Sequence, residues 1–367
     1  MVVEILDTNF QFVDYLYEFE SFIWTDRYNK PGDFEIFAPA KSKNLNLFKR
    51  NYYVKIDMSE HLMIIEDVVW QSSAESGDHV KVTGRSLESI LDRRIVWGEY
   101  EMPATNSKDV QSEVFALLEQ EVINGRDIAD RKIPNFECKR KDDIPGMSDS
   151  LAGGSFKGDS LLKIIEDLTD EYDFGWKLIY DEETGKLIFS FFAGVDRTEG
   201  YDLGERGFVE FSPEYENVIE STYSEISSDT RTAMLVGGTW REEDEEEPIF
   251  EGIGRGSGIQ RREIFYESNV DKTDEMSRTQ YCDAIRLDGG KELQKYRLVS
   301  TFDGKYETNI QFKYGKNFFI GDIVTVKDVF GHTSSARVTE FIRSINISNG
   351  EEAYPTFEMV IPEEDNQ

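Results

Sequence analysis

The chain has 367 residues, which at about 100–200 residues per domain indicates two to four domains. Hydrophobic residues make up 39% and the 28 glycines add about 8% (28/367), a composition that excludes wholesale disorder. The 41 basic and 73 acidic residues give a net charge of −32 (41 − 73), which repels phosphate backbones and argues against a general nucleic-acid binder.

The cysteines and the apolar segments exclude several further classes. Cys138 and Cys282 lie far apart and form no CxxC pair, so neither a disulfide framework nor a zinc site is expected. The opening MVVEILDTNF lacks the basic and apolar regions of a signal peptide. No apolar run approaches the ~20 residues of a membrane span, so we expect cytoplasmic synthesis and no membrane-spanning segment.

The first hundred residues have the pattern of β-strands. Short runs rich in aromatic and β-branched residues are separated by turn signals such as Pro31-Gly32. LMIIEDVVWQ and HVKVTGR form two further strands that flank the polar SSAESGD. This pattern predicts a curled sheet or a small barrel.

The pattern changes to α+β after Pro103. Ser107 is placed to cap a helix, and a second helix is expected after Asp159, with a β-hairpin following at 176–192. Charged residues, glycine and proline dominate 125–158, which indicates a long connection. The apolar stripe of the first helix consists of Val110, Val114, Leu117, Leu118 and Val122.

Strands return after residue 216 and continue to the C-terminal end. They are interrupted by an acidic run at 242–247, by the glycine-rich GIGRGSG, and by a helix expected over 274–287 that stops at Gly289-Gly290. The acidic run lacks the alternating spacing of a calcium loop, which favours a solvated loop.

The last strands resemble the first ones. YYVKID, a turn with His61, LMIIEDVVWQSS and HVKVTGR recur in order as DIVTVKD, a turn with His332, ARVTEFIRSINIS and PTFEMV. In this alignment the central strands carry Glu66 and Glu340 at equivalent positions. The pattern fits a duplication, although unrelated three-stranded meanders are common.

Two glycine-rich segments approach nucleotide-binding motifs without matching them. GGSFKGDS has Asp159 where a phosphate-binding loop needs lysine, which favours a capped helix start. GIGRGSG is followed by a strand pattern, QRREIFY, whereas a dinucleotide site needs a helix N-terminus there, so we interpret it as a flexible loop.

The remaining reactive residues form no catalytic pattern. His61, His79 and His332 have no metal-ligand spacing, and no GxSxG motif accompanies them. The 73 acidic residues make coincidental carboxylate pairs inevitable, so pairing alone carries no information. We therefore assign no catalytic, cofactor-binding or metal-binding residue, no cofactor, and no enzymatic activity.

An ordered set of local patterns resembles a known family, the siphophage tail-hub or tail-associated (tail-tip) proteins. The resemblance covers about residues 2–361. It rests on FIWTDRYNKPGDFEIFAP, VVWQSSAESGDHVKVTGRSLESILDRRI, SLLKIIEDLTDEYDFGWKLIYD, RREIFYES, the helix before Leu287, YGKNFFIGDIVTVKD and RVTEFIRSINISNGEEAYPTFEM.

The resemblance implies a fold similar to the central baseplate hub of contractile phages. That fold is mainly β, with two related β-barrel domains and two smaller α+β modules, and it assembles into a ring. In this chain the division is expected as 1–103 with 201–216 (first barrel), 104–200 (α+β module), 217–245 with 300–362 (second barrel), 246–299 (helix-containing module) and 363–367 (tail).

The function implied by the resemblance is structural. Such a hub joins a six-fold tail tube to a three-fold tip and forms part of the genome-delivery channel in the virion. The implied partners are two further copies in a homotrimer, distal tail and tail tube proteins, receptor-binding or tip proteins, and DNA in transit through an acidic lumen. A cell-wall hydrolase and a host-surface carbohydrate-binding module are the alternatives. Because the chain ends soon after its last strand, no additional host-recognition or wall-degrading domain is expected.

Overall fold

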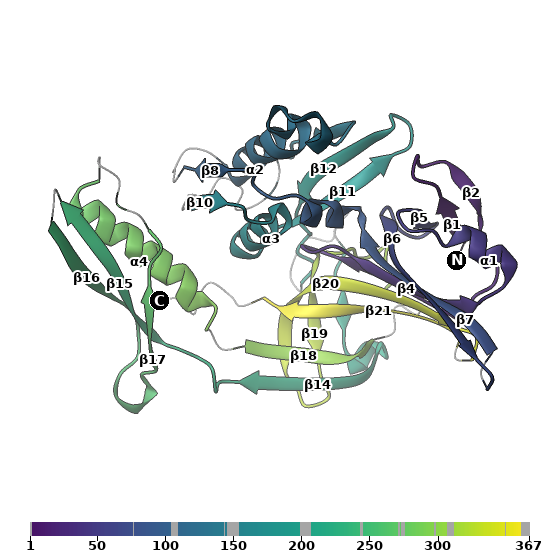
Figure 1. Ribbon diagram of the computed structural model, residues 1–367. Coiled ribbons are helices and arrows are strands. Elements are labelled where there is room, and N and C mark those ends of the chain that lie inside the picture. The colour runs from purple at the N-terminus through teal and green to yellow at the C-terminus, as the bar shows by residue number, and fades with distance from the viewer. Residues whose placement is uncertain are drawn as a thin grey trace.

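The fold was determined as a computed structural model (Figure 1). It describes residues 2–75, 77–103, 109–142, 144, 154–198, 207–242, 245–270, 272, 276–296, 299–306, 312–348 and 350–360. The mainly β fold expected from the sequence is confirmed: strands of large and small sheets dominate, and few helices cover them.

The largest sheet contains strands from both ends of the chain. Its order is β13-β19-β20-β3-β4-β7-β6-β5-β1-β2, and β21 pairs with β20 off this path. The two predicted barrel regions are therefore joined edge to edge through β3 and β20, which pair antiparallel over seven residues, 21–27 against 340–346.

The first barrel region buries one face of its sheet. In β4 every second side chain is buried, and the buried set includes Phe34 and Ile36. Phe22 and Trp24 of β3 join them in one core with the apolar residues of β5, β6 and β7. The elements are β1 (Val3–Leu6), β2 (Phe12–Tyr15), β3 (Ser21–Arg27), β4 (Asp33–Pro39), α1 (Ser42–Leu47), β5 (Tyr53–Ile56), β6 (Leu62–Ser73) and β7 (Gly77–Ser86).

The second barrel region repeats this strand order. The first region runs β1-β5-β6-β7-β4-β3, and the second runs β13-β19-β20-β21, with β18 lying beside β21 and paired to β14. Tyr306 of β18 and Phe357 of β21 place their ring centroids 4.8 Å apart. One difference is that β13 runs parallel to β19, whereas β1 is antiparallel to β5. The elements are β13 (Glu210–Phe211), β14 (Val218–Ile226), β18 (Val299–Tyr306), β19 (Ile323–Lys327), β20 (Thr333–Asn346) and β21 (Gly350–Met359).

A β-bulge marks the same point of both central strands and fixes their correspondence. The pairing of β6 with β7 skips Glu66, and the pairing of β20 with β21 skips Thr339. Thr339, and not Glu340 as the sequence alignment suggested, is thus the counterpart of Glu66, and Glu340 corresponds to Asp67. An alignment of the two sequence segments by identical residues misses this one-residue shift, because a bulge is recognised only from the pairing with the neighbouring strand.

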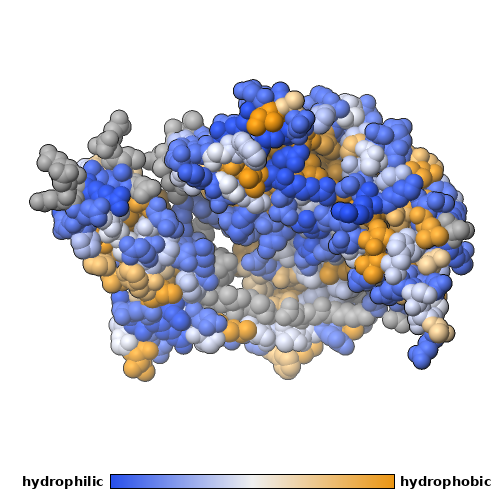
Figure 2. All heavy atoms as spheres, viewed as in Figure 1, coloured by the Kyte–Doolittle hydropathy of each residue, from blue (hydrophilic) through white to orange (hydrophobic). Residues whose placement is uncertain are grey.

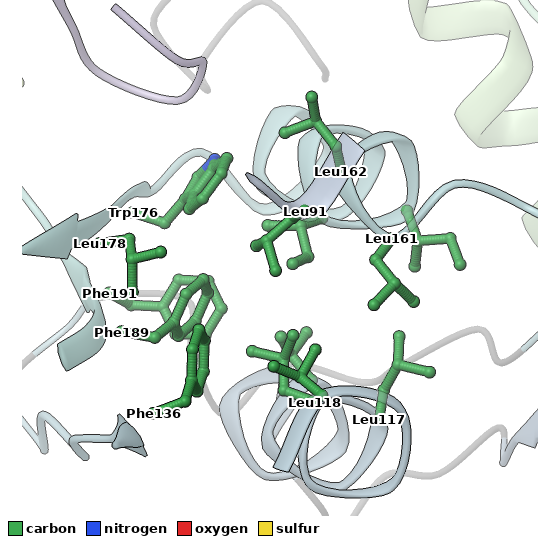
Figure 3. Close-up of a cluster of buried hydrophobic side chains, with 14 of the residues drawn as sticks. Leu91, Leu117, Leu118, Phe136, Leu161, Leu162, Trp176, Leu178, Phe189 and Phe191 are labelled. Atoms are coloured by element: carbon green, nitrogen blue, oxygen red, sulfur yellow. The ribbon is translucent and has the colours of Figure 1, made fainter. Parts of the chain in front are cut away.

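The α+β module packs its helices and a small sheet around one apolar core (Figure 3). Leu117 and Leu118 of α2 face Leu161 of α3 across this core, and Phe189 closes one side. The N-cap of α2 is Asp109, whose side chain accepts from the Ser112 amide; the expected cap, Ser107, lies outside the described residues. The elements are β8 (Glu99–Met102), α2 (Val110–Leu118), β9 (Phe136–Cys138), β10 (Gly154–Lys157), α3 (Leu161–Tyr172), β11 (Gly175–Asp181) and β12 (Lys186–Phe192).

A smaller module stands apart from the barrels, on the left of Figures 1 and 2. One helix packs on a three-stranded sheet of order β16-β15-β17. The helix does not stop at Gly289-Gly290 as expected but runs through both residues. Gly289 is required for close packing, because a Cβ there would approach Val236 Cγ2 to 2.2 Å. The elements are β15 (Ala233–Glu242), β16 (Glu245–Gly254), β17 (Glu263–Glu267) and α4 (Arg278–Gln294).

Two strands lie in sheets other than those their expected domains suggest. β13, within the segment 201–216 assigned to the first barrel, pairs with β19 of the second. β15, assigned to the second barrel, pairs with β16 and β17, so the acidic run lies at a hairpin rather than in an open loop. Local sequence cannot indicate such partners because pairing across the fold decides them. The remaining domain boundaries stay a prediction.

Candidate functional site

The junction between the two barrel regions is built around a buried ion pair. Arg343 Nη1 in β20 lies 2.7 Å from Asp26 Oδ2 in β3, and both side chains are at most 4% exposed. Asp26 also accepts hydrogen bonds of 2.8 Å from Trp24 Nε1 and Ser59 Oγ. The Arg343 guanidinium lies 5.1 Å from the ring centroid of Tyr314. This ring contact and the several donors to Asp26 offset part of the cost of removing two charges from water.

A second, partly exposed charge cluster lies at the same junction. Arg27 Nε lies 2.6 Å from Glu340 Oε1, and its Nη1 lies 2.6 Å from Asp33 Oδ2. Burial would lower the pKa of Arg27, but the two carboxylates hold it above its usual value. Three strands, β3, β4 and β20, are therefore held together by this charge cluster.

A third contact attaches the α+β module to both barrels. Arg337 of β20 pairs with Asp173, donates to the Gly321 carbonyl at 2.8 Å, and lies 5.0 Å from the Tyr28 ring centroid. Burial raises the pKa of Tyr28 to about 12, so this hydroxyl stays protonated at neutral pH. Gly175 lies against the same ring, where a Cβ would come within 2.6 Å.

His61 and Glu88 form a further contact between the first barrel and β11 of the α+β module. His61 Nδ1 lies 3.0 Å from Glu88 Oε1, at ion-pair distance but without the angle of a hydrogen bond. Glu88, only 2% exposed, accepts from the Leu178 amide of β11 at 3.0 Å. Burial lowers the pKa of His61, but the carboxylates of Glu88, Asp26 and Glu60 together raise it to about 9. Burial raises the pKa of Glu88, but His61, Ser86 and the Leu178 amide together hold it below its usual value.

The other residues considered for chemistry have structural contacts. His79 Nε2 lies 2.9 Å from Glu20, and His332 Nδ1 lies 2.6 Å from Asp328. Cys138 and Cys282 are free thiols, and burial raises the pKa of each. Within the described ranges, no three His, Cys, Asp or Glu side chains form a metal-binding group.

The two nucleotide-like segments have ordinary local roles. Asp159 accepts a 2.7 Å hydrogen bond from the Lys157 amide just before α3, in the described part of GGSFKGDS. The first three residues of GIGRGSG, 252–254, belong to β16 and not to the flexible loop expected; a short turn then leads to β17, the strand expected after it. None of the helices within the described residues is both long and apolar enough to cross a membrane.

Sequence analysis assigns no site residue and does not identify the charged residues of the junctions. Asp26 continues an alternating row of apolar residues, Phe22 and Trp24, and Arg343 stands between Phe341 and Ile345 in a similar row. A charge at an inward position of a buried strand is the signal that could have identified them, because such a charge requires a partner. The partner itself lies 317 positions away and was not visible in the sequence.

Comparison with known protein families matches residues 2–361 to the family described as Siphovirus ReqiPepy6 Gp37-like protein. The chain belongs to this family. The resemblance to siphophage tail proteins is thereby confirmed over the range in which it was expected. No curated protein sequence matches the chain.

Solved structures show that the fold of this Gp37-like chain is shared with other tail proteins. The tail protein from Neisseria meningitidis MC58 has a TM-score of 0.57 at 11% identity, with 97% of this chain and 96% of that chain covered. The 43 kDa tail protein of prophage MuSo2 from Shewanella oneidensis gives 0.58 at 10% identity, with 98% of both covered. The prophage tail protein gp18 from Listeria monocytogenes EGD-e gives 0.52 at 12% identity, with 98% and 94% covered. At these identities the likeness establishes the fold alone.

Proposed function

We propose that the chain is the hub at the distal end of a phage or phage-derived tail, where three copies form a ring around the genome-delivery channel. The observation that carries this proposal is the repeated strand order of the two barrel regions within one chain. Three chains with two such regions each present 3 × 2 = 6 similar units. A closed trimer can therefore contact a six-fold tube on one side and a three-fold tip on the other.

The rigid connections between the parts support a structural role. The buried pair Asp26–Arg343 and the pair Arg337–Asp173 hold the two barrels and the α+β module in one arrangement. A ring that transmits load from a tail tube requires such fixed geometry. The partners expected for it are the distal tail protein, tail tube proteins, and receptor-binding or tip proteins.

The net charge supports the passage of DNA. Three copies carry 3 × −32 = −96 charges, and a negative channel wall repels phosphates, so that DNA slides through without being held. Tight binding of duplex DNA by the assembled ring at moderate salt would contradict this part of the proposal.

Localisation in the virion provides the direct test. Antibody-gold labelling of intact particles is expected to mark the tail tip, and particles that lack the chain are expected to have tubes without a completed tip. Labelling along the tube or on the head would contradict the hub assignment. A zymogram on host cell wall is expected to show no lysis; a cleared band would favour the hydrolase alternative.

A further inference from the structure

The central strands of the two barrel regions, β6 and β20, correspond residue by residue. They differ in whether a second strand pairs with their other edge. In β20, residues 340–346 pair with β21 on one side and with β3 on the other. Their counterparts in β6, offset by 273 through the two bulges, are 67–73. Among the described strands, this part of β6 pairs with β7 alone.

The exposure of the side chains follows this difference. Residues 340–346 are all buried or half-buried, whereas every residue from 67 to 72 except Val68 is exposed. One pair of counterparts illustrates the contrast: Arg343 is 2% exposed, and Trp70 is 42% exposed. Val69, beside it, is 48% exposed. A long strand that ends in an open edge with large apolar side chains is a surface for pairing with another strand.

β14, the counterpart of β3 in the second barrel, also has an edge that no described strand pairs with. β14 occupies the position in the second barrel that β3 occupies in the first. β14 pairs with β18, which lies beside β21. In the same way, β3 pairs with β4, which pairs with β7. β3 has neighbours on both edges, but β14 pairs with β18 alone among the described strands. Ile219 and Ile226 of β14 are 54% and 56% exposed.

We propose that the outer half of β6 in one chain pairs antiparallel with β14 of the next chain, as β20 pairs with β3 within a chain. The proposal deepens the trimer of the proposed function by naming the two surfaces that form it. β6 and β14 are different surfaces of the chain, so the contact is head-to-tail and generates a ring when its rotation closes. With three chains, three internal and three intermolecular junctions alternate around the ring.

The two kinds of junction use different chemistry at their centres. Within the chain, the core-facing position of β20 is Arg343, which finds its partner Asp26 during folding. In β6 the same position is Trp70, and the sequence of β14, VIESTYSEI, contains neither lysine nor arginine. An exposed tryptophan costs far less in the free chain than an unpaired buried charge, and it is a strong anchor when a partner covers it. The intermolecular junction is thus suited to form after each chain has folded.

Paired cysteines test the contact. In a chain carrying Cys138→Ser and Cys282→Ser, Gln71→Cys is combined in turn with Glu220→Cys, Thr222→Cys or Ser224→Cys, which samples the register of β14. Oxidation of the concentrated protein is expected to give covalent dimers and closed trimers for one of these combinations. Gln71→Cys with Val329→Cys is the matched control, because Val329 is 69% exposed but lies outside both strands, and it is expected to give no cross-link.

A charge substitution gives an independent measurement. Trp70→Glu is expected to raise the protein concentration needed for trimer formation about thirtyfold or more, because a central tryptophan is a typical hot spot. Val329→Glu is expected to leave it unchanged. Sedimentation velocity measures both, and circular dichroism checks that each variant is folded.

Two results would overturn the proposal. One is an oligomer in which none of the β6–β14 combinations cross-links. The other is a chain that remains monomeric, without cross-links, up to millimolar concentration and also when incorporated in particles. The gold-labelling experiment is independent of both results. Failure of the proposed β6–β14 interface can therefore be distinguished from failure of the proposed location at the tail tip.

Discussion

The junction between the barrels and the apolar core of the α+β module are stabilised by different interactions. The apolar core is filled by side chains such as Leu118, Leu161 and Phe189 (Figure 3), while the module's buried Glu121 is paired with Arg126 and Arg131. The junction instead contains Asp26 and Arg343, each at most 4% exposed. Apolar packing is non-directional and supplies stability, whereas a buried ion pair forms in one geometry only. The contrast indicates that the apolar core supplies stability and that the buried pair Asp26–Arg343 fixes the angle between the barrels.

The largest expected effect comes from breaking the junction pair. Asp26→Ala should lower the free energy of unfolding by about 3–5 kcal/mol, because it leaves Arg343 buried without a partner. Adding Arg343→Met should recover most of the loss. Urea unfolding followed by fluorescence measures both variants. As a control, Asp167→Asn in the exposed pair with Lys163 should cost less than about 0.5 kcal/mol. Equal effects of Asp26→Ala and Asp167→Asn would refute the contrast drawn above.

The module core should respond to volume rather than to charge. Leu118 is fully buried, so Leu118→Ala should cost about 3 kcal/mol through lost burial and a residual cavity. Leu118→Met keeps the volume and should cost less than about 1.5 kcal/mol. Thermal unfolding compares the two variants. If both were equally destabilising, the tight packing inferred for this core would be wrong.

The small helix module offers a matched pair of neighbouring glycines. Gly289→Ala should destabilise it by about 1–3 kcal/mol, because the new methyl overlaps Val236. Gly290→Ala meets no atom within 4 Å and should stabilise α4 by up to about 1 kcal/mol. Hydrogen exchange of α4 amides reports on this module separately. A gain in protection for Gly289→Ala would show that the helix is not held close to the sheet.

A pH dependence is expected at the contact between the first barrel and the module. The pKa of His61 is raised to about 9, so the stabilisation is fully present below about pH 6.5 and is lost as the pH rises through 9. Between pH 6 and 10, His61→Gln should therefore lose a pH-dependent contribution on the order of 2 kcal/mol, measured as the difference from the unchanged chain. As a control, His79→Gln, whose partner Glu20 is 40% exposed, should lower the free energy of unfolding at pH 6 by less than His61→Gln does. A pH-independent difference for His61→Gln would contradict the ion pair.

The sequence by itself determined the local elements and the family. Alternating apolar residues in DFEIFAP and the stripe from Val110 to Val122 predicted a strand and a helix correctly, because side-chain period follows directly from backbone geometry. The ordered strand and turn patterns from residue 2 to 361 were sufficient for the tail-protein resemblance. These features depend on residues close together in the chain.

Only the tertiary structure decided which strands meet. The pairing of β3 with β20 joins residues more than 300 positions apart, and the bulge at Thr339 moved the counterpart of Glu66 by one residue. Gly289 was interpreted as a helix stop because glycine is common there, yet its function is close contact with Val236 on a neighbouring strand. Pairing, register and close approach depend on a partner surface, and the chain acquires that surface only when it folds.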